Sequence, residues 1–201
     1  PFVEDGPGLF KQYWLALYFS SFMSALCQGP GIVLNMLGFE TVEGFRDPCF
    51  LSQGINDFWG RRWNMMVHGF LRRVYFENAR AWTGSKALGT AAAFAGSAAI
   101  HEALIYNLSL HVDPSAAALA RSGLGSQSMF FISQAVLCYV ERRCQTTFPG
   151  LVDSLTQLPR IVQALLTAAA ITPLGHLFTD PLVQNGLMKS LFEHTPHFRF
   201  D

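Results

Sequence analysis

Charged residues are scarce in this sequence. Only 14% of the 201 residues are Asp, Glu, Lys or Arg, whereas soluble domains carry about 25%. The fourteen acidic and fourteen basic side chains cancel, so bulk electrostatics give no basis for binding nucleic acid. Apolar residues make up half of the chain, and eighteen residues are phenylalanine. This composition favours a membrane protein and leaves a soluble enzyme as a distant alternative.

Cysteine is also scarce, and its placement argues against two kinds of site. The cysteines form no CxxC pair and no dense framework, and neither His nor Asp is grouped around them. Zinc sites and disulfide scaffolds both need such groupings. We therefore expect no metal site and no cofactor, and we interpret the four thiols as apolar packing groups: Cys27, Cys49, Cys138 and Cys144.

The apolar residues gather in four segments, at 9–37, 87–110, 127–140 and 161–178. The second has 24 residues, enough to cross the roughly 30 Å hydrocarbon core of a bilayer with some tilt. The sequence contains no internal repeat and no low-complexity tract. We predict an all-α membrane protein with about four transmembrane helices, in which residues 1–201 form a single membrane-embedded domain.

Proline and glycine predict interruptions in two of these segments. Gly29-Pro30-Gly31 should end the first helix near Leu26, because proline removes a backbone hydrogen bond and clashes with the preceding turn. Pro173 and Gly175 predict a kink in the fourth segment. The second segment differs from the others in its many small residues, which let neighbouring helices approach closely. We therefore expect that helix to be buried in a bundle.

Residues 57–75 separate into two faces when they are placed on a helical wheel of about 100° per residue. The apolar face carries Trp59, Trp63, Met66, Val67, Phe70 and Val74. The opposite face carries Arg61, Arg62, Asn64, His68, Arg72 and Arg73. A surface helix of a soluble protein can show this pattern, but the overall composition favours an amphipathic helix lying in the membrane interface. Seven Lys and Arg residues between Gly38 and Lys86 place it on the cytosolic side.

His101-Glu102 is the ionisable pair that lies deepest in a predicted span. It is about 15 residues, or roughly 20 Å, from the cytosolic end of that helix. Ionisable groups at such depth are costly and are usually functional. The alternative is a neutral packing histidine hydrogen-bonded to a neighbouring helix. Ser97 shares the face of His101, whereas adjacent residues point about 100° apart, so Glu102 is not expected to orient the imidazole.

These motifs together resemble the membrane-bound O-acyltransferase family, in particular its wax synthase-like branch. The resemblance rests on Asp57-Phe-Trp-Gly-Arg-Arg-Trp-Asn64, on Arg72-Arg-Val-Tyr75, and on a small-residue membrane helix carrying His101-Glu102. It is strongest over residues 52–107. It implies that Asn64 and His101 are the catalytic pair. Asn64-Met-Met-Val-His68 also resembles diacylglycerol and sterol acyltransferases, which makes His68 a candidate for contacting substrate.

The resemblance implies transfer of a fatty acyl group from acyl-CoA, as co-substrate, to a lipophilic alcohol, giving a wax or neutral-lipid ester. The chain would then be the C-terminal half of the family's larger helical bundle. Arg61 and Arg62 lie where the phosphates of acyl-CoA would approach, although anionic lipid heads explain a cationic interfacial face equally well. The other expected substrate-binding residues are Trp59, Trp63 and His68.

The competing hypothesis is a non-catalytic subunit, a shortened acyltransferase fold that binds lipid or packs within a larger membrane complex. The presence of both Asn64 and His101 favours the enzyme, whereas the small number of helices favours the subunit. In either case the expected partners are membrane lipids and possible further membrane subunits. The expected location is the endoplasmic reticulum, with another organellar membrane as the alternative.

Overall fold

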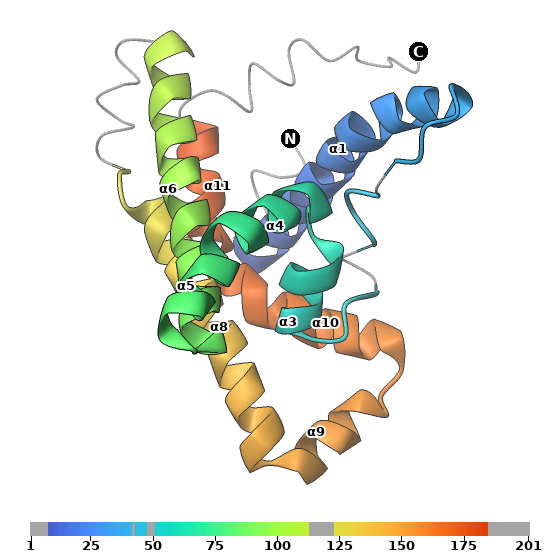
Figure 1. Cartoon of the computed structure of the whole chain (residues 1–201), viewed down its shortest axis with the longest axis vertical. Helices are drawn as coiled ribbons and strands as arrows, with labels where there is room; N and C mark the ends of the chain where they lie inside the picture. The colour runs from blue at the N-terminus through green and yellow to red at the C-terminus, as the bar shows by residue number, and fades with distance from the viewer. Residues whose placement is uncertain (1–7, 42, 48–50, 113–122, 185–201) are drawn as a thin grey trace.

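A computed structural model describes residues 8–41, 43–47, 51–112 and 123–184. In these ranges the secondary structure is helical, and no strand occurs among them. Helix α1 comes first, followed by a group of short helices, by two long helices that pack on each other, and by a bent C-terminal segment (Figure 1). The elements are α1 (Gly8–Met36), α3 (Ile55–Asp57), η1 (Phe58–Arg62), α4 (Met65–Leu71), η2 (Arg72–Phe76), α5 (Glu77–Thr83), α6 (Lys86–Val112), α8 (Ser126–Thr147), α9 (Pro149–Thr156), α10 (Arg160–Ile171), η3 (Thr172–Leu174) and α11 (Gly175–Gln184).

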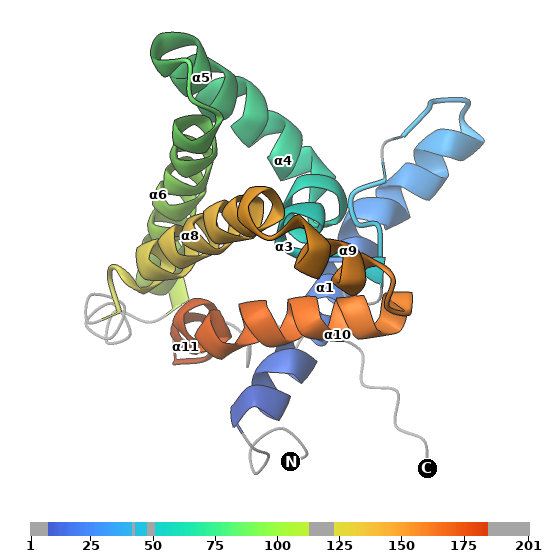
Figure 2. The same cartoon turned by 90° about the horizontal axis from the view of Figure 1, so that it is seen from below.

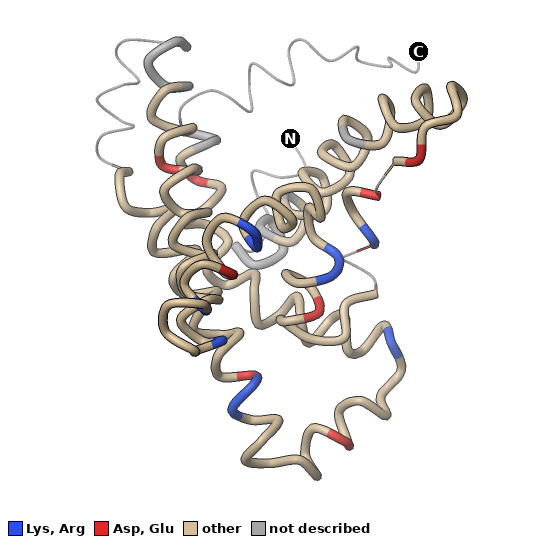
Figure 3. Tube along the Cα trace, in the orientation of Figure 1, with Lys and Arg blue, Asp and Glu red and all other residues tan. Residues whose placement is uncertain are grey.

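Three helical stretches in the described ranges are long and apolar enough to cross a membrane: Ala16–Met36, Lys86–Asn107 and Arg160–Pro181. The prediction of an all-α membrane protein is therefore confirmed. The predicted third span forms helix α8 but is not among these three, because it carries polar residues along its length and ends on Glu141-Arg-Arg143. Figure 3 shows the same division, with few charged residues along α1 and α6 and more on the short helices and the end of α8.

Proline has different effects in α1 and in the C-terminal segment. The predicted break near Leu26 is wrong, because α1 continues through Pro30 to Met36. A membrane helix can tolerate the single backbone hydrogen bond that an internal proline removes. The predicted kink at Pro173 is confirmed: the backbone changes to a 3-10 turn at η3, and α10 and α11 run in different directions (Figures 1 and 2).

The predicted continuous helix over 57–75 is also wrong. Trp63 is extended, and Asn64 adopts the left-handed conformation with φ of 42°. Asparagine tolerates this region better than most residues, because its short polar side chain can bond to the local backbone. The break separates η1 from α4, so the two tryptophans do not continue the apolar face of α4.

Helices α6 and α8 form the centre of the fold and run antiparallel. Glu102, in the C-terminal half of α6, meets the start of α8, whereas Thr90, in its first turns, accepts a hydrogen bond from Arg142 near the end of α8. Ala98, Phe130 and Phe131 are buried at this contact. Partly buried side chains from three other elements pack against them: Trp59, Leu174, Leu177 and Phe178, together with Phe94 of α6.

Small residues of α6 receive aromatic rings from η2, which is the close approach that its composition predicts. The expectation of a helix buried in a bundle is met only in part, because other faces of α6 are open and leave Leu88 and Leu104 exposed. Gly89 faces Phe76, and Gly96 faces Tyr75. A Cβ atom on Gly96 would lie 2.6 Å from Tyr75 Cε2 and 2.8 Å from Tyr75 Cγ. The overlap includes Cγ as well as the ring edge, and Cγ does not move when the ring rotates about its own axis, so ring rotation cannot relieve it. The absence of a side chain at Gly96 therefore sets the distance between η2 and α6.

We expect Gly96→Ala to destabilise the protein by about 1–3 kcal/mol, because overpacking must displace Tyr75 and the π-helical turn that carries it. Gly150→Ala is the matched control, since a Cβ atom there meets nothing within 4 Å. Thermal unfolding of the two variants in detergent measures the difference. Equal midpoints for Gly96→Ala and Gly150→Ala would contradict the close approach of η2 to α6.

Candidate active site

His101 lies where α6, α8 and α11 meet. Its ring centroid is 4.6 Å from that of Phe131 on α8 and 5.5 Å from that of Phe178 on α11. The two phenylalanines also contact each other at 6.0 Å. The imidazole is only partly exposed, so its polar atoms have an apolar, aromatic environment on two sides.

The hydrogen bond of His101 fixes the tautomer of its neutral ring. Nδ1 lies 2.8 Å from the backbone oxygen of Ser97, one turn earlier in α6, and 3.5 Å from the Ser97 hydroxyl. A carbonyl oxygen only accepts, so Nδ1 must carry the hydrogen and donate it. Nε2 then keeps its lone pair. The partner lies in the same helix, unlike the interhelical bond expected of a packing histidine.

Glu102 holds the start of α8 and does not bond to His101. Its Oε1 accepts hydrogen bonds from the backbone N–H groups of Gly125 at 2.9 Å and Ser128 at 3.0 Å. These N–H groups belong to the N-cap residue and to the first turn of α8, where no partner exists within the helix. The sequence-based expectation that Glu102 does not orient the imidazole agrees with this geometry.

Asn64 is the N-cap of α4. Its Oδ1 accepts a hydrogen bond from the backbone N–H of Val67 at 3.2 Å. Among the described residues we find no direct contact between Asn64 and His101, so their joint catalytic role stays a prediction. The two are connected through aromatic rings that start next to Asn64: Trp63 contacts Trp59 at 6.1 Å, Trp59 contacts Phe131 at 6.2 Å, and Phe131 contacts His101.

Trp59 and Trp63 face the protein rather than lipid. Trp59 packs on Phe94, Phe130 and Phe131, and its indole N–H donates to Gln134 Oε1 at 3.3 Å. Trp63 stacks on Phe58 and meets Phe45 edge to face. The prediction that the apolar face of residues 57–75 lies in the membrane interface is therefore wrong for the tryptophans, because the break at Asn64 turns η1 inward. Phe70 of α4 and Val74 of η2 do remain exposed.

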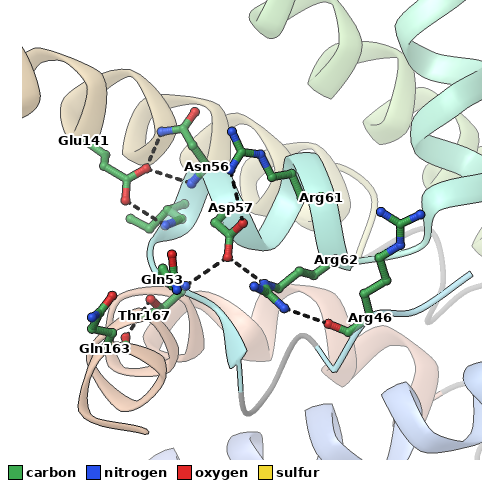
Figure 4. A network of polar contacts seen from close by, with 10 residues as sticks. Arg46, Gln53, Asn56, Asp57, Arg61, Arg62, Glu141, Gln163 and Thr167 are labelled. Atoms are coloured by element: carbon green, nitrogen blue, oxygen red, sulfur yellow. Dashed lines mark hydrogen bonds and ion pairs between the residues drawn. The ribbon is translucent and has the colours of Figure 1, made fainter. Parts of the chain in front are cut away.

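Arg61 and Arg62 have different surroundings (Figure 4). Arg62 Nε donates to Asp57 Oδ2 at 2.6 Å, and Arg62 also donates to the backbone oxygen of Arg46 at 3.2 Å. Arg61 reaches Asp57 only at 3.9 Å, and its side chain is 80% exposed. Arg62 thus stabilises the segment Asp57–Asn64, whereas Arg61 can contact an anion from solvent. A role of either in substrate binding stays a prediction.

His68 lies on α4, one turn beyond Asn64. Burial lowers the pKa of His68 below its usual value, and the positive charge of Arg72 lowers it further. The neutral form is therefore favoured at neutral pH. A neutral imidazole can donate or accept a hydrogen bond, which is compatible with the substrate contact predicted from the sequence.

Glu141 is a residue of this region that the sequence analysis missed. Its carboxylate accepts from the backbone N–H groups of Ile55 and Asn56 at 2.8 and 2.7 Å, and from the side-chain amide of Asn56 (Figure 4). It lies 86 positions from Ile55 along the chain. We find no local sequence signal that indicates this contact, since Glu141 reads as the polar end of an apolar helix.

Comparison with known proteins agrees with the resemblance seen in the motifs. Residues 43–133 match the model of the Membrane bound O-acyl transferase family. The chain is 29% identical over 168 residues to "Probable long-chain-alcohol O-fatty-acyltransferase 3" of Arabidopsis thaliana. This match covers 80% of this chain and 45% of that protein. It is 27% identical over 175 residues to "Long-chain-alcohol O-fatty-acyltransferase" of Simmondsia chinensis, covering 82% of this chain and 45% of that protein.

A third relative matches over a shorter stretch. The chain is 44% identical over 45 residues to "Acyl-CoA--sterol O-acyltransferase 1" of Arabidopsis thaliana, which is 22% of this chain and 13% of that protein. No solved structure matches the chain. The chain thus spans about half the length of the long-chain-alcohol acyltransferases that it matches, at 45% of each. These enzyme names do not favour the alternative of a non-catalytic subunit.

We expect Asp57→Ala to destabilise the protein by roughly 1–3 kcal/mol, because it removes the carboxylate that accepts from Arg62 Nε and from the Gln53 N–H. Glu43→Ala is the control, since Glu43 pairs with Arg46 between side chains that are 60% and 50% exposed. That pair should contribute less than about 1 kcal/mol. Thermal unfolding of both variants tests this, and equal losses would contradict the structural role of the Asp57–Arg62 pair.

Proposed function

Over residues 43–133 this chain belongs to the membrane bound O-acyl transferase family, and from this premise we propose that the protein transfers a fatty acyl group from acyl-CoA to the hydroxyl of a long-chain alcohol. The product is a wax-type or neutral-lipid ester. The observation that supports the proposal best is the free lone pair on His101 Nε2, which follows from the bond between Nδ1 and the Ser97 carbonyl.

His101 acts as the general base in the proposed reaction. Nε2 takes the proton from the alcohol as its oxygen attacks the carbonyl carbon of the thioester. The new C–O bond forms and the C–S bond breaks, and Nε2 returns the proton to the sulfur of the departing coenzyme A thiolate. A positioned base of this kind contributes about 10² to 10⁴-fold to the rate. The aromatic surroundings provided by Phe131 and Phe178 suit apolar acyl and alcohol chains.

Asn64 is the proposed hydrogen-bond donor to the substrate. Its Oδ1 is engaged with the Val67 N–H, so the Nδ2 hydrogens are the part of the amide that can stabilise negative charge on the thioester oxygen. Trp59 and Trp63, which connect Asn64 to Phe131, are proposed to line the path of the acyl chain. His68, in its neutral form, is proposed to contact the substrate close to Asn64.

Arg61 is the proposed contact for the phosphates of acyl-CoA on the cytosolic side, because its guanidinium is exposed and only weakly paired. Arg62 is proposed to contribute indirectly, by holding Arg61 and the motif in place. Residues 1–201 are proposed to act as part of a larger membrane-embedded acyltransferase bundle, in the endoplasmic reticulum. No resident cofactor is proposed, since acyl-CoA is consumed as a co-substrate.

The test uses the full-length protein, labelled long-chain acyl-CoA and a fatty alcohol. We expect His101→Ala to reduce ester formation at least 100-fold, because it deletes the proton acceptor. The small side chain should fit among the small residues of α6, so the variant should elute normally. His176→Ala is the control, since His176 is exposed on α11 and bonds to the Pro173 carbonyl.

Two results would oppose the proposal. One is a wild-type protein that makes no ester with any acyl-CoA and alcohol pair. The other is a folded His101→Ala variant as active as His176→Ala. The first result would favour the non-catalytic lipid-binding subunit.

A further inference from the structure

The short helix α3 is held to α8 by one carboxylate. Glu141 Oε1 accepts from the Ile55 N–H at 2.8 Å, and Oε2 accepts from the Asn56 N–H at 2.7 Å and from the Asn56 side-chain amide (Figure 4). The same amide nitrogen donates to the backbone oxygen of Cys138 at 3.0 Å. Both oxygens of Glu141 and the Cys138 carbonyl, one turn earlier in α8, thus bind Ile55 and Asn56, which directly precede Asp57.

The chain around α3 is built for this contact. Helix α3 has three residues, and the N–H groups of a first helical turn have no partner inside the helix. Glu141 supplies partners for two of them. Gly54, directly before α3, has φ of 156°, and a Cβ atom there would clash with Glu141 Oε1. The backbone therefore reaches the carboxylate only because residue 54 is glycine.

Helix α8 contacts both His101 and the residues that lead into the segment Asp57–Asn64. Along one face it contacts the His101 ring through Phe131, the Trp59 indole through Gln134, and Asn56 through Cys138 and Glu141. Asn56 lies eight positions before Asn64, and Trp59 lies between them in sequence. The position of α3 along α8 consequently sets where η1, Trp63 and Asn64 stand relative to the imidazole.

We propose that Glu141 is a positioning residue for acyl transfer, which holds the Asp57–Asn64 motif in register with His101. This inference rests on the function proposed above. Glu141 contacts neither His101 nor the proposed donor amide of Asn64, so it acts through the motif. A displacement of about 1 Å between reacting groups can cost roughly 100-fold in rate.

The role is separable from folding because the core does not depend on Glu141. Ala98, Phe130 and Phe131 form the contact between α6 and α8, and Glu102 holds the start of α8 independently. Loss of the Glu141 contacts should release α3 and η1 while the long helices stay packed. The expected signature is a fall in kcat without a matching loss of folded protein.

The first test is Glu141→Gln in the full-length protein. Glutamine keeps the shape and one acceptor oxygen, but its NH₂ group cannot accept from the second backbone N–H. We expect kcat for ester formation to fall about 10 to 100-fold, with KM for acyl-CoA within about twofold. Glu77→Gln is the matched control, since Glu77 pairs with Arg72 between side chains that are 45% and 61% exposed; its kcat should equal that of wild type.

A second variant disturbs the same contact from the other side. Gly54→Ala places a methyl group against Glu141 Oε1 and should show the same kcat loss with unchanged KM. Gly84→Ala controls for backbone strain, because Gly84 also has positive φ, at 70°, but a Cβ atom there meets nothing within 4 Å. The double variant Gly54→Ala/Glu141→Gln should lose no more kcat than the worse single variant, since both remove one interaction.

The outcomes separate the two proposals. Active wild type with the expected kcat loss in both variants, at normal elution and yield, supports the positioning role. Active wild type with Glu141→Gln at full kcat overturns the inference and leaves the proposed function standing. Rates that fall only in proportion to the amount of folded protein also overturn it, because they indicate a purely structural carboxylate. Wild type that makes no ester overturns the proposed function, and the inference falls with it.

Discussion

The contact between α6 and α8 is the interaction on which the rest of the structure depends. In a membrane, helix association relies on close van der Waals packing rather than on removal of apolar surface from water. Ala98 meets Phe130 and Phe131 at this contact, and Gly96 lets the ring of Tyr75 lie directly against α6. His101 belongs to the same interface, so the packing that holds the fold also places the imidazole.

Carboxylates complement this packing at the two ends of α8. Glu102 binds the N–H groups of its first turn, and Glu141 binds those of α3. In both cases an acidic side chain accepts from backbone groups that a short or starting helix leaves unpaired. Such charge-assisted bonds are stronger than those between neutral groups. They explain how a chain with few charged residues uses two of them to hold its helices in register.

Several features of the candidate site could be predicted from the sequence, and others could not. The small-residue helix carrying His101 was recognisable because its composition and its lone deep histidine are local properties. The break at Trp63 and Asn64 could not be predicted, because a helical wheel assumes a continuous helix. The continuation of α1 through Pro30 could not be predicted either, since a long apolar helix can lose one hydrogen bond without ending. Arg62 read as a surface cation, yet its partners Asp57 and Arg46 hold it within the fold.

By itself, the sequence determined the helical membrane class, the extent of α6 and the bend near Pro173, because apolar content and proline act locally. It also carried the motifs that relate the chain to the acyltransferases. Only the tertiary structure decided that Trp59 turns inward onto Phe131, that the His101 Nδ1–H donates to the Ser97 carbonyl, and that Glu141 holds Asn56 from 85 positions away. These features arise from contacts between elements that are far apart in sequence. The spacing of residues along one helix does not determine which carboxylate will accept hydrogen bonds from the backbone of another.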